Sequence, residues 1–412
     1  MYDSWVEALE YKQFTGVCFL DLSAAFDIVD HPLLLDKLQL YGFADDSLNW
    51  MRSYLNGRSQ TVYIEGTQSK ILPVPTGVPQ GSILGPLLYI IFTNELPELV
   101  HDHQARPGKL YNMICQPCGS LCCYADDSSF SCSNTNLDTI ENKITDNYNT
   151  IAAFMNNNKL KLNGDKTHLM LLGSDSARKH KLHANSFSLD TGQEIIKTTD
   201  CENLLGGFIS QNLKWTNHIL LNEKSLVKQL VTRLNALRKI SKFADFKTRK
   251  MLADGLFMSK LVYLIPLWGG CEKFLIKALQ IIQNKAARSV TKQGIFTPVQ
   301  LLLKQCGWLS VHQLVFFHTL VLLFKTNQNK TPQYLFDMTS SDLNYKTRAE
   351  NPGKLRSVAD YIPEQGLNRK SYKWRSTMYW NQLPPDIRLM DNLGKFKVKL
   401  KSWVLLNIDI NP

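Results

Sequence analysis

Two groups of aspartates have the types and the surroundings that divalent cations require. Asp21 ends a run of alternating, strand-like residues that starts at position 17, and a carboxylate at such a strand end is directed at solvent or metal. Asp126 and Asp127 follow the apolar run 121–124 and precede Ser128, so we expect them at the tip of a β-hairpin. The sequence therefore predicts two strand ends that bring carboxylates together.

These carboxylates suit magnesium chemistry. Mg²⁺ prefers one or two carboxylates plus substrate phosphates, and two such ions about 3.5–4 Å apart can hold both oxygens of an in-line phosphoryl displacement. We predict Asp21 and Asp126 as bridging ligands, and Asp127, which points to the other face of its strand, as a weaker ligand. An aspartate pair alone is more often only turn chemistry. Its combination with Asp21 and with Pro79-Gln80-Gly81 favours a phosphoryl-transfer site.

These segments carry a resemblance to a known family. Phe19–Asp27, Gly77–Pro86 and Tyr124–Asp127 resemble motifs A, B and C of reverse transcriptases from non-LTR retrotransposons, the LINE-type and jockey-like elements. Leu160–Thr167 resembles motif D, and Leu205–Ile209 resembles the primer-grip region. The segments that resemble the region after the polymerase core in metazoan elements are Trp268–Gly269, Gln283–Arg288 and Trp380–Arg388. The resemblance covers nearly the whole chain.

The resemblance implies an activity and a fold. The activity is RNA-directed DNA polymerisation from dNTPs onto a primer 3′-OH, with an RNA template and a DNA primer as partners and two Mg²⁺ ions, or Mn²⁺ as a substitute, as cofactors. The fold is α+β: a right-hand polymerase palm with an antiparallel sheet and packed helices, then a mainly helical thumb and a C-terminal region. The implied domains are the palm at 1–215, the thumb-like basic region at 216–330 and the C-terminal region at 331–412.

The resemblance also implies roles for single residues. Phe26 would be a steric gate that leaves no room for a ribonucleotide 2′-hydroxyl. Gly81 would let backbone approach the substrate, and Lys166 would face the departing pyrophosphate. The implied metal ligands are Asp21, Leu22, Asp126 and Asp127. The implied nucleotide-binding residues are Leu22, Phe26, Gln80 and Gly81. The implied primer-grip residues are Leu205, Gly206 and Gly207.

These roles have plainer alternatives. Without the resemblance, Phe26 is more simply interpreted as a core aromatic residue, and Pro79-Gln80-Gly81 as a turn. Lys166 alone is an ordinary solvated lysine.

Charge supports contact with a polyanion. Residues 1–215 hold 16 Lys and Arg against 24 Asp and Glu, a net charge of −8, whereas residues 216–412 hold 31 against 12, a net charge of +19. Lysine and arginine contacts to phosphates give affinity that is independent of base sequence. The predicted nucleic-acid-binding residues are Lys224, Lys228, Arg233, Lys285 and Arg288. A basic face that serves only solubility is the alternative.

One feature departs from the family. A fingers region precedes motif A in the family and holds the triphosphate, yet only twenty residues precede Asp21 here. We therefore expect an N-terminally truncated chain without fingers or endonuclease. The alternative function is a catalytically inactive retroelement relic that only binds nucleic acid.

Composition limits the other classes of protein. At 412 residues and 44% hydrophobic, the chain can bury a large core. No apolar run reaches the ~18 residues of a membrane span, and we expect 83–92 and 314–324 to be buried helices. The first residues do not resemble a secretory signal, and nine cysteines suit a reducing compartment. We expect a protein that is intracellular, in nucleus and cytoplasm, and not membrane-bound.

A zinc site is a weaker hypothesis. Cys115 and Cys118 have a zinc-like spacing, with His101 and His103 nearby. The next pair, Cys122-Cys123, is adjacent rather than spaced, so we expect it to pack in the strand before Asp126 as small apolar residues.

Periodicity predicts the remaining elements. Helices are expected from Asp30 to Gly42, from Asp45 to near Gly57, from Ser82 onward, over 138–156 and over 218–240. A hairpin with a Glu65-Gly66 turn is expected over 61–72, and strands over 160–172. Residues 347–370 are polar and are expected to form a mobile linker before the block 374–403.

Overall fold

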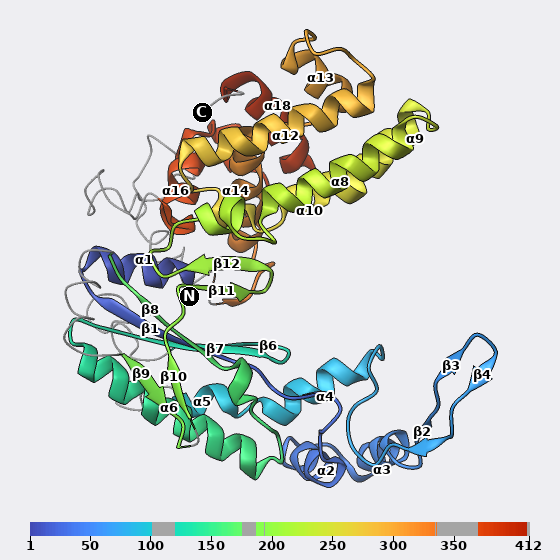
Figure 1. Cartoon of the computed structure of the whole chain (residues 1–412), viewed down its shortest axis with the longest axis vertical. Coiled ribbons are helices and arrows are strands. Elements are labelled where there is room, and N and C mark those ends of the chain that lie inside the picture. The colour runs from blue at the N-terminus through green and yellow to red at the C-terminus, as the bar shows by residue number, and fades with distance from the viewer. Residues whose placement is uncertain (101–119, 175–186, 193, 334, 336–369, 410–412) are drawn as a thin grey trace. The chain divides into compact units, whose positions relative to one another are not determined.

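The chain forms two compact units. The computed structural model describes residues 1–412 except 101–119, 175–186, 193, 334, 336–369 and 410–412 (Figure 1). One unit contains Met1 and residues 12–205, and the other contains residues 2–11 and 206–412. Helix α1 (Tyr2–Glu10) therefore belongs with the second half of the chain. The predicted linker 347–370, except Lys370, and the zinc candidates Cys115 and Cys118 lie outside the described residues.

The first unit is built on a four-stranded sheet. Its strand order is β6 (Ser120–Tyr124), β7 (Asp127–Asn134), β1 (Phe14–Leu20) and β8 (His168–Leu172). Every neighbouring pair is antiparallel, as the sequence predicts. Because β1 has a strand on each side, it is buried along nearly all of its length. A central strand thus leads straight to Asp21.

Helix α6 (Leu137–Asn157) covers one face of this sheet (Figure 1). Asn136 caps it by accepting a hydrogen bond from the amide of Asp138. Gly16 of β1 lets the helix approach, since a Cβ atom there would lie 2.6 Å from Ile140 Cγ2. The buried residues of α6 recur every three or four positions, as an amphipathic helix requires: Leu137, Ile140, Ile144, Tyr148, Ile151, Phe154 and Met155. The predicted helix over 138–156 is confirmed.

The segment before the sheet's last strand differs from prediction. Strands were expected over 160–172, but only β8 is a strand of the sheet. Leu162 makes a single antiparallel bridge with Leu22, and Gly164–Lys166 forms the 3₁₀ turn η1. Further strands of the first unit are β9 (Ser188–Asp190), β10 (Ile195–Lys197) and β11 (Cys201–Leu204).

Two helices and a hairpin follow β1. Helices α2 (His31–Leu40) and α3 (Asp45–Leu55) have the predicted extents, and Asp30 caps α2 by accepting a hydrogen bond from Leu33 N at 3.0 Å. The predicted hairpin is confirmed, with a turn at Glu65-Gly66. Its paired strands are β2 (Ser59–Gln60) with β5 (Leu72–Pro73), and β3 (Tyr63–Ile64) with β4 (Thr67–Gln68).

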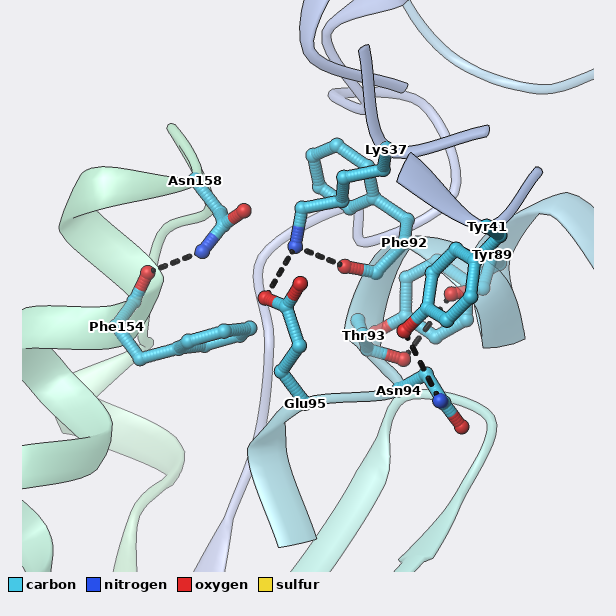
Figure 2. Close-up of polar contacts among 9 residues, drawn as sticks. All are labelled: Lys37, Tyr41, Tyr89, Phe92, Thr93, Asn94, Glu95, Phe154 and Asn158. Atoms are coloured by element: carbon cyan, nitrogen blue, oxygen red, sulfur yellow. Dashed lines mark hydrogen bonds and ion pairs between the residues drawn. The ribbon is translucent and has the colours of Figure 1, made fainter. Parts of the chain in front are cut away.

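A buried lysine joins α2 to helix α4 (Leu84–Thr93). Lys37 Nζ donates to the Phe92 carbonyl at 2.9 Å and to the Glu95 carboxylate at 2.8 Å (Figure 2). It also lies 5.2 Å from the ring centroids of Phe92 and Phe154. A buried cation is costly unless it is paired and hydrogen-bonded, and these contacts satisfy it. Lys37 therefore fixes the helix that begins within motif B.

The apolar sequence of helix α4 predicts a helix that is buried on every side, but the structure buries only one face. Its inner face is buried, with Leu88 and Phe92 fully enclosed. The opposite face leaves Leu87 and Ile90 more than half exposed, and Ile83, just before the helix, 94% exposed. The expectation of a wholly buried helix over 83–92 is therefore wrong for one face. Helix α5 (Leu96–Val100) follows.

The second unit is mainly helical. Strand β12 (Gly207–Ser210) and the π-helical turn η2 (Asn217–Leu221) begin its main segment. Its longer helices are α8 (Leu226–Ser241), α12 (Lys273–Thr291), α14 (Val311–Asn327), α16 (Tyr372–Gln382) and α18 (Leu393–Asn407). Its shorter helices are α9 (Phe246–Leu252), η3 (Ala253–Met258), α10 (Ser259–Val262), α11 (Ile265–Trp268), α13 (Val299–Cys306) and α17 (Pro385–Arg388).

Aromatic residues fill the core of this unit. The rings of Phe324 and Phe396 stack at 4.1 Å between centroids, and those of Phe316 and Tyr379 stack at 4.4 Å. These contacts join α14 to α16 and α18. Helix α1 docks through Asp3, whose carboxylate accepts hydrogen bonds from backbone amides at the start of α16 at 2.9 and 2.7 Å.

The helix predicted over 218–240 is divided in two. Asn222 ends η2 and its side chain accepts a hydrogen bond from Lys224 N at 2.8 Å, which turns the chain before α8 begins. The predicted apolar positions are nevertheless all buried: Ile219, Leu226, Leu230, Leu234 and Leu237. The expected buried helix over 314–324 is confirmed as part of α14.

Among the described residues, no single helix has the length and apolar character needed to cross a membrane. The pair α13 and α14, bent by 42°, meets those criteria only when the two helices are taken together.

Candidate active site

The predicted aspartates lie at one end of the sheet of the first unit. Asp126 and Ala125 form a two-residue turn between Tyr124 and Asp127, which pair across β6 and β7. Ala125 has a left-handed φ of +54°, which tight hairpin turns demand. The register of β1 against β7 pairs Leu20 with Ser128. Asp21 therefore follows β1 directly opposite Asp127, and the predicted hairpin with carboxylates at its tip is confirmed.

The three carboxylates repel one another. Desolvation raises the pKa of Asp127 above its ordinary value, and the negative charges of Asp126 and Asp21 raise it further. Such a cluster of like charges favours binding of a cation, which removes the repulsion.

Asp21 has a buried carboxylate oxygen without a hydrogen bond from the described residues. Its Oδ2 is buried and accepts no hydrogen bond from any group in the described part of the chain. Lys166 Nζ, on turn η1, lies 3.3 Å from that oxygen as an ion pair, outside hydrogen-bond geometry. Because the Lys166 side chain is 66% exposed, solvent weakens this pair. Lys166 thus lies beside the predicted metal ligand, where it balances part of the negative charge.

Backbone hydrogen bonds hold the strand end that carries Asp21. Asn163 N donates to the Asp21 carbonyl at 3.0 Å, and Ser23 N donates to the Lys161 carbonyl at 2.9 Å. These two bonds flank the bridge of Leu22 with Leu162. In an antiparallel bridge of this kind, the backbone N–H and C=O of the central residue point away from the partner segment. The Leu22 carbonyl is therefore not used by this bridge, which suits its predicted role as a backbone ligand.

These residues fit a divalent cation. Carboxylate and carbonyl oxygens form the hard donor set that Mg²⁺ and Mn²⁺ accept, and the buried Asp21 oxygen has no hydrogen bond from the described residues, only the ion pair with Lys166. Within the described ranges, no three His, Cys, Asp or Glu side chains converge into a complete metal cage. An ion held by one or two carboxylates and by substrate phosphates does not need such a cage.

Motif B is held directly against motif A. Gly77 N donates to the Val29 carbonyl, and Val78 N donates to the Phe26 carbonyl, each at 2.8 Å. The Gly77 carbonyl lies 2.7 Å from His31 Nε2. Gly77 has a φ of +89°, and a Cβ atom there would lie 2.6 Å from the Asp27 carbonyl oxygen. Only glycine fits this close approach.

Gln80 reaches the same loop through its side chain. Its Nε2 donates to Asp27 Oδ1 at 2.8 Å. Both residues line a polar cavity of about 640 Å³, together with Arg58 and residues 73–79. Gly81 has a φ of +79° and no atom within 4 Å of where its Cβ would be. The predicted nucleotide-pocket residues Gln80 and Gly81 are thus accessible.

Phe26 packs on an aromatic support. Its ring lies 4.5 Å from that of Tyr89, between centroids, at an angle of 31°. Tyr89 is 3% exposed, and desolvation together with the nearby Asp126 raises its pKa. Phe26 is partly exposed and packs against the hydrophobic core of this unit. The steric gate therefore stays a prediction.

Sequence reasoning missed three supporting residues. Tyr89 holds Phe26, Asp27 orients Gln80 and His31 holds Gly77. Tyr89 and His31 fall at apolar or capping positions of helices, where sequence patterns predict only packing. Asp27 was part of the motif but had no predicted role.

The predicted primer grip lies where the two units divide. Leu205 and Gly206 have consecutive left-handed φ values of +48° and +78°, and Gly207 begins β12. The primer-grip role of these three residues stays a prediction.

The predicted nucleic-acid-binding residues differ in the contacts that their side chains make with the rest of the protein. Lys224, Lys228 and Lys285 are exposed. Arg233 Nη1 donates to the Leu256 carbonyl at 2.6 Å, and Arg288 Nη2 donates to the Ile295 carbonyl at 3.2 Å. These two arginines therefore have structural contacts as well as charge.

The predicted packing of Cys122 and Cys123 is wrong. Both residues are exposed, on opposite faces of β6, which is an edge strand of the sheet.

Comparison with known proteins identifies the family. Residues 5–218 match the family model for reverse transcriptase (RNA-dependent DNA polymerase). Since the match covers just over half of the chain, the chain belongs to the reverse transcriptase family. Its curated relatives come from non-LTR elements, which confirms the LINE-type, jockey-like resemblance. The family match fits a polymerase palm fold.

Two relatives illustrate the similarity. The probable RNA-directed DNA polymerase from transposon BS of Drosophila melanogaster is 26% identical over 291 residues, which cover 69% of this chain and 30% of that protein. The RNA-directed DNA polymerase from mobile element jockey of Drosophila funebris is also 26% identical, over 69% of this chain and 29% of that protein. The chain thus spans about three tenths of the length of these relatives.

Among solved structures, a telomerase from Candida tropicalis in complex with a fragment of telomeric RNA is similar, with 13% identity and a TM-score of 0.36. The alignment covers 76% of this chain and 49% of the telomerase. The family assignment rests on the sequence match.

Proposed function

We propose that this chain catalyses RNA-directed DNA synthesis, adding deoxynucleotides to the 3′-OH of a DNA primer paired with an RNA template. The observation that supports this most is the carboxylate cluster at the end of the sheet. Asp21 has a buried oxygen without a hydrogen bond, opposite a hairpin whose Asp127 has a pKa raised by its charged neighbours. Family membership supplies the reaction class.

We propose that Asp21, Asp126 and the Leu22 carbonyl hold two Mg²⁺ ions, with Asp127 as a weaker ligand. When bound, the ions would stabilise negative charge on the attacking and leaving oxygens of the displacement. Mn²⁺ has the same donor preference and would substitute.

The other residues position the nucleotide. Phe26, held by Tyr89, would lie beneath the sugar and exclude a 2′-hydroxyl. Gln80 has its amide fixed by Asp27, and both residues line the polar cavity that would receive the nucleotide. Lys166 would exchange its weak pair with Asp21 for the pyrophosphate, where its proton can neutralise the leaving group.

The basic second unit would bind the template and primer through phosphate contacts. Lys224, Lys228 and Lys285 are exposed and therefore available for this. Such binding is independent of base sequence and weakens as salt increases.

Primer extension tests the proposal. A DNA primer on an RNA template is incubated with Mg²⁺ and dNTPs, and the parent chain is compared with Asp126→Asn at one salt concentration. Extension by the parent alone supports catalysis. If neither extends the primer while both bind it, the chain is a binding relic of the family and the proposed activity is wrong.

A further inference from the structure

Two phenylalanines of the second unit are almost completely exposed. Phe243 lies between α8 and α9 and is 92% exposed, and Phe296 lies between α12 and α13 and is 93% exposed. Burying a phenylalanine side chain is favourable, and neither of these two rings is buried in the folded chain. Exposed apolar side chains that gather at one place mark an interaction site.

A buried arginine brings the two loops together. Arg249 is 6% exposed, and its Nε donates to the Val290 carbonyl at 2.7 Å while its Nη1 donates to the Ala244 carbonyl at 2.6 Å. One guanidinium thus joins the loop after α8 to the end of α12. Arg288 orders the second loop through its hydrogen bond to the Ile295 carbonyl. We define the basic-aromatic tip as residues 238–250 and 288–298.

The tip carries a strong positive charge. Its residues include eight Lys and Arg and one acid, Asp245. The carboxylate of Asp245 has a partner within the protein, because it caps α9 by accepting a hydrogen bond from Thr248 N at 2.9 Å. The exposed cations are Arg238, Lys239, Lys242, Lys247 and Lys292.

A concave surface lies beside one of the rings. Phe243 borders an open hollow of about 600 Å³, whose lining also includes Lys239, Thr248 and the helix-capping Asp245. A planar apolar ring at the edge of such a hollow, with cations around it, can stack a base while the cations contact the adjoining phosphates.

We propose that the basic-aromatic tip binds an unpaired stretch of RNA, with one base stacked on Phe243 and another on Phe296. This rests on the proposed function, because an RNA template is the polyanion that the chain would hold. Paired RNA offers its phosphates but keeps its bases inside the helix. Exposed aromatic rings can therefore stack on the bases of unpaired RNA and not on those of paired RNA. The charge of the tip supplies the phosphate contacts.

The test measures binding of a labelled, unstructured 12-nucleotide RNA without Mg²⁺ or dNTPs. We expect Phe243→Ala and Phe296→Ala each to weaken binding by about five- to 150-fold, the loss of one base stack. Phe243→Trp retains a stacking surface and is expected to keep the affinity. Because both rings are exposed, neither alanine variant should change the thermal melting temperature.

Phe274→Ala is the matched control. Phe274 is 55% exposed and lies in the first turn of α12, about 21 Å along the helix from the tip at 1.5 Å per residue. Its removal is expected to leave the affinity unchanged. An equal loss in this variant would show that any exposed ring contributes, and would overturn the assignment to the tip.

Other outcomes also overturn the proposal. These are unchanged affinity in both tip variants, or an equal loss of affinity for single-stranded RNA and for a 12-base-pair RNA duplex. Binding of phosphatidylserine vesicles that depends on Phe243 and Phe296, with RNA affinity unchanged, would make the tip a lipid contact instead.

Failure of the proposed polymerase function can be distinguished from failure of the RNA-binding tip. The binding assay does not require the active site, so an Asp126→Asn chain is expected to bind the 12-nucleotide RNA like the parent. Loss of RNA affinity in the tip variants of a chain that extends no primer would support the tip and refute the polymerase activity.

Discussion

Replacing Gly77 by alanine tests how motif B is held against motif A. A Cβ atom at this position would lie 2.6 Å from the Asp27 carbonyl oxygen and 2.8 Å from its Cα. Both are backbone atoms, so no side-chain rotation relieves the contact. The φ of +89° adds the cost of a left-handed conformation, about 1–2 kcal/mol for a residue with a Cβ. The overlap itself adds about 1–3 kcal/mol.

We therefore expect Gly77→Ala to lower the free energy of unfolding of the first unit by about 2–5 kcal/mol. Displacement of motif B would also separate Gln80 from Asp27, so KM for dNTP should rise. Urea denaturation followed by circular dichroism measures the stability, and steady-state primer extension measures KM.

Gly66→Ala is the matched control. Gly66 has a φ of +86°, and its nearest atom is 4.0 Å from where the Cβ would lie. The Gly66→Ala variant should lose only the free energy of unfolding that the left-handed conformation costs, about 1–2 kcal/mol, and its KM for dNTP should be unchanged. If Gly77→Ala costs no more than Gly66→Ala, or leaves KM unchanged, the close approach of the motifs does not hold the pocket.

Three further changes test separate parts of the site. Lys37→Met removes a buried cation with two hydrogen bonds and should lower the free energy of unfolding by about 2–4 kcal/mol. The control Lys70→Met changes an exposed lysine and should leave that free energy unchanged. Equal losses in the two variants would contradict the role of Lys37. The pKa of Asp127 is raised from 3.8 by desolvation and by Asp126 and Asp21, so without metal the folded state binds more protons in the window above 3.8 and its stability falls as pH rises there. Asp127→Asn should lessen that fall in melting temperature; an unchanged pH profile would refute the repulsion. Phe26→Val should raise ribonucleotide incorporation relative to deoxynucleotide incorporation, and an unchanged ratio would remove the steric gate.

Much of the first unit was predictable from local sequence. The alternating run before Asp21 and the apolar run before Asp126 predicted two strand ends, and the structure shows both. Capping at Asp30 and the Glu65-Gly66 turn were predictable for the same reason, since each depends on the chemistry of a few adjacent residues.

What depends on tertiary contacts was not predictable. The contact of Phe26 with Tyr89 and that of Lys37 with Glu95 join residues 63 and 58 positions apart, and no local pattern encodes them. The helix predicted over 218–240 failed because its apolar spacing continues across the Asn222 turn. The exposure of Cys122 depends on which strand lies at the sheet edge, which the sequence alone does not state.

The most direct test of the central claim is a double-mutant cycle on Asp21 and Asp126. Single-turnover incorporation of one dNTP into a bound primer and template is measured for Asp21→Asn, Asp126→Asn and the double variant, with exposed Asp165→Asn as control. If both carboxylates hold the same pair of ions, each single variant loses at least about 10²-fold in rate, and the double variant loses little more. Losses that multiply in the double variant, or a single variant that reacts like Asp165→Asn, would contradict the shared metal site.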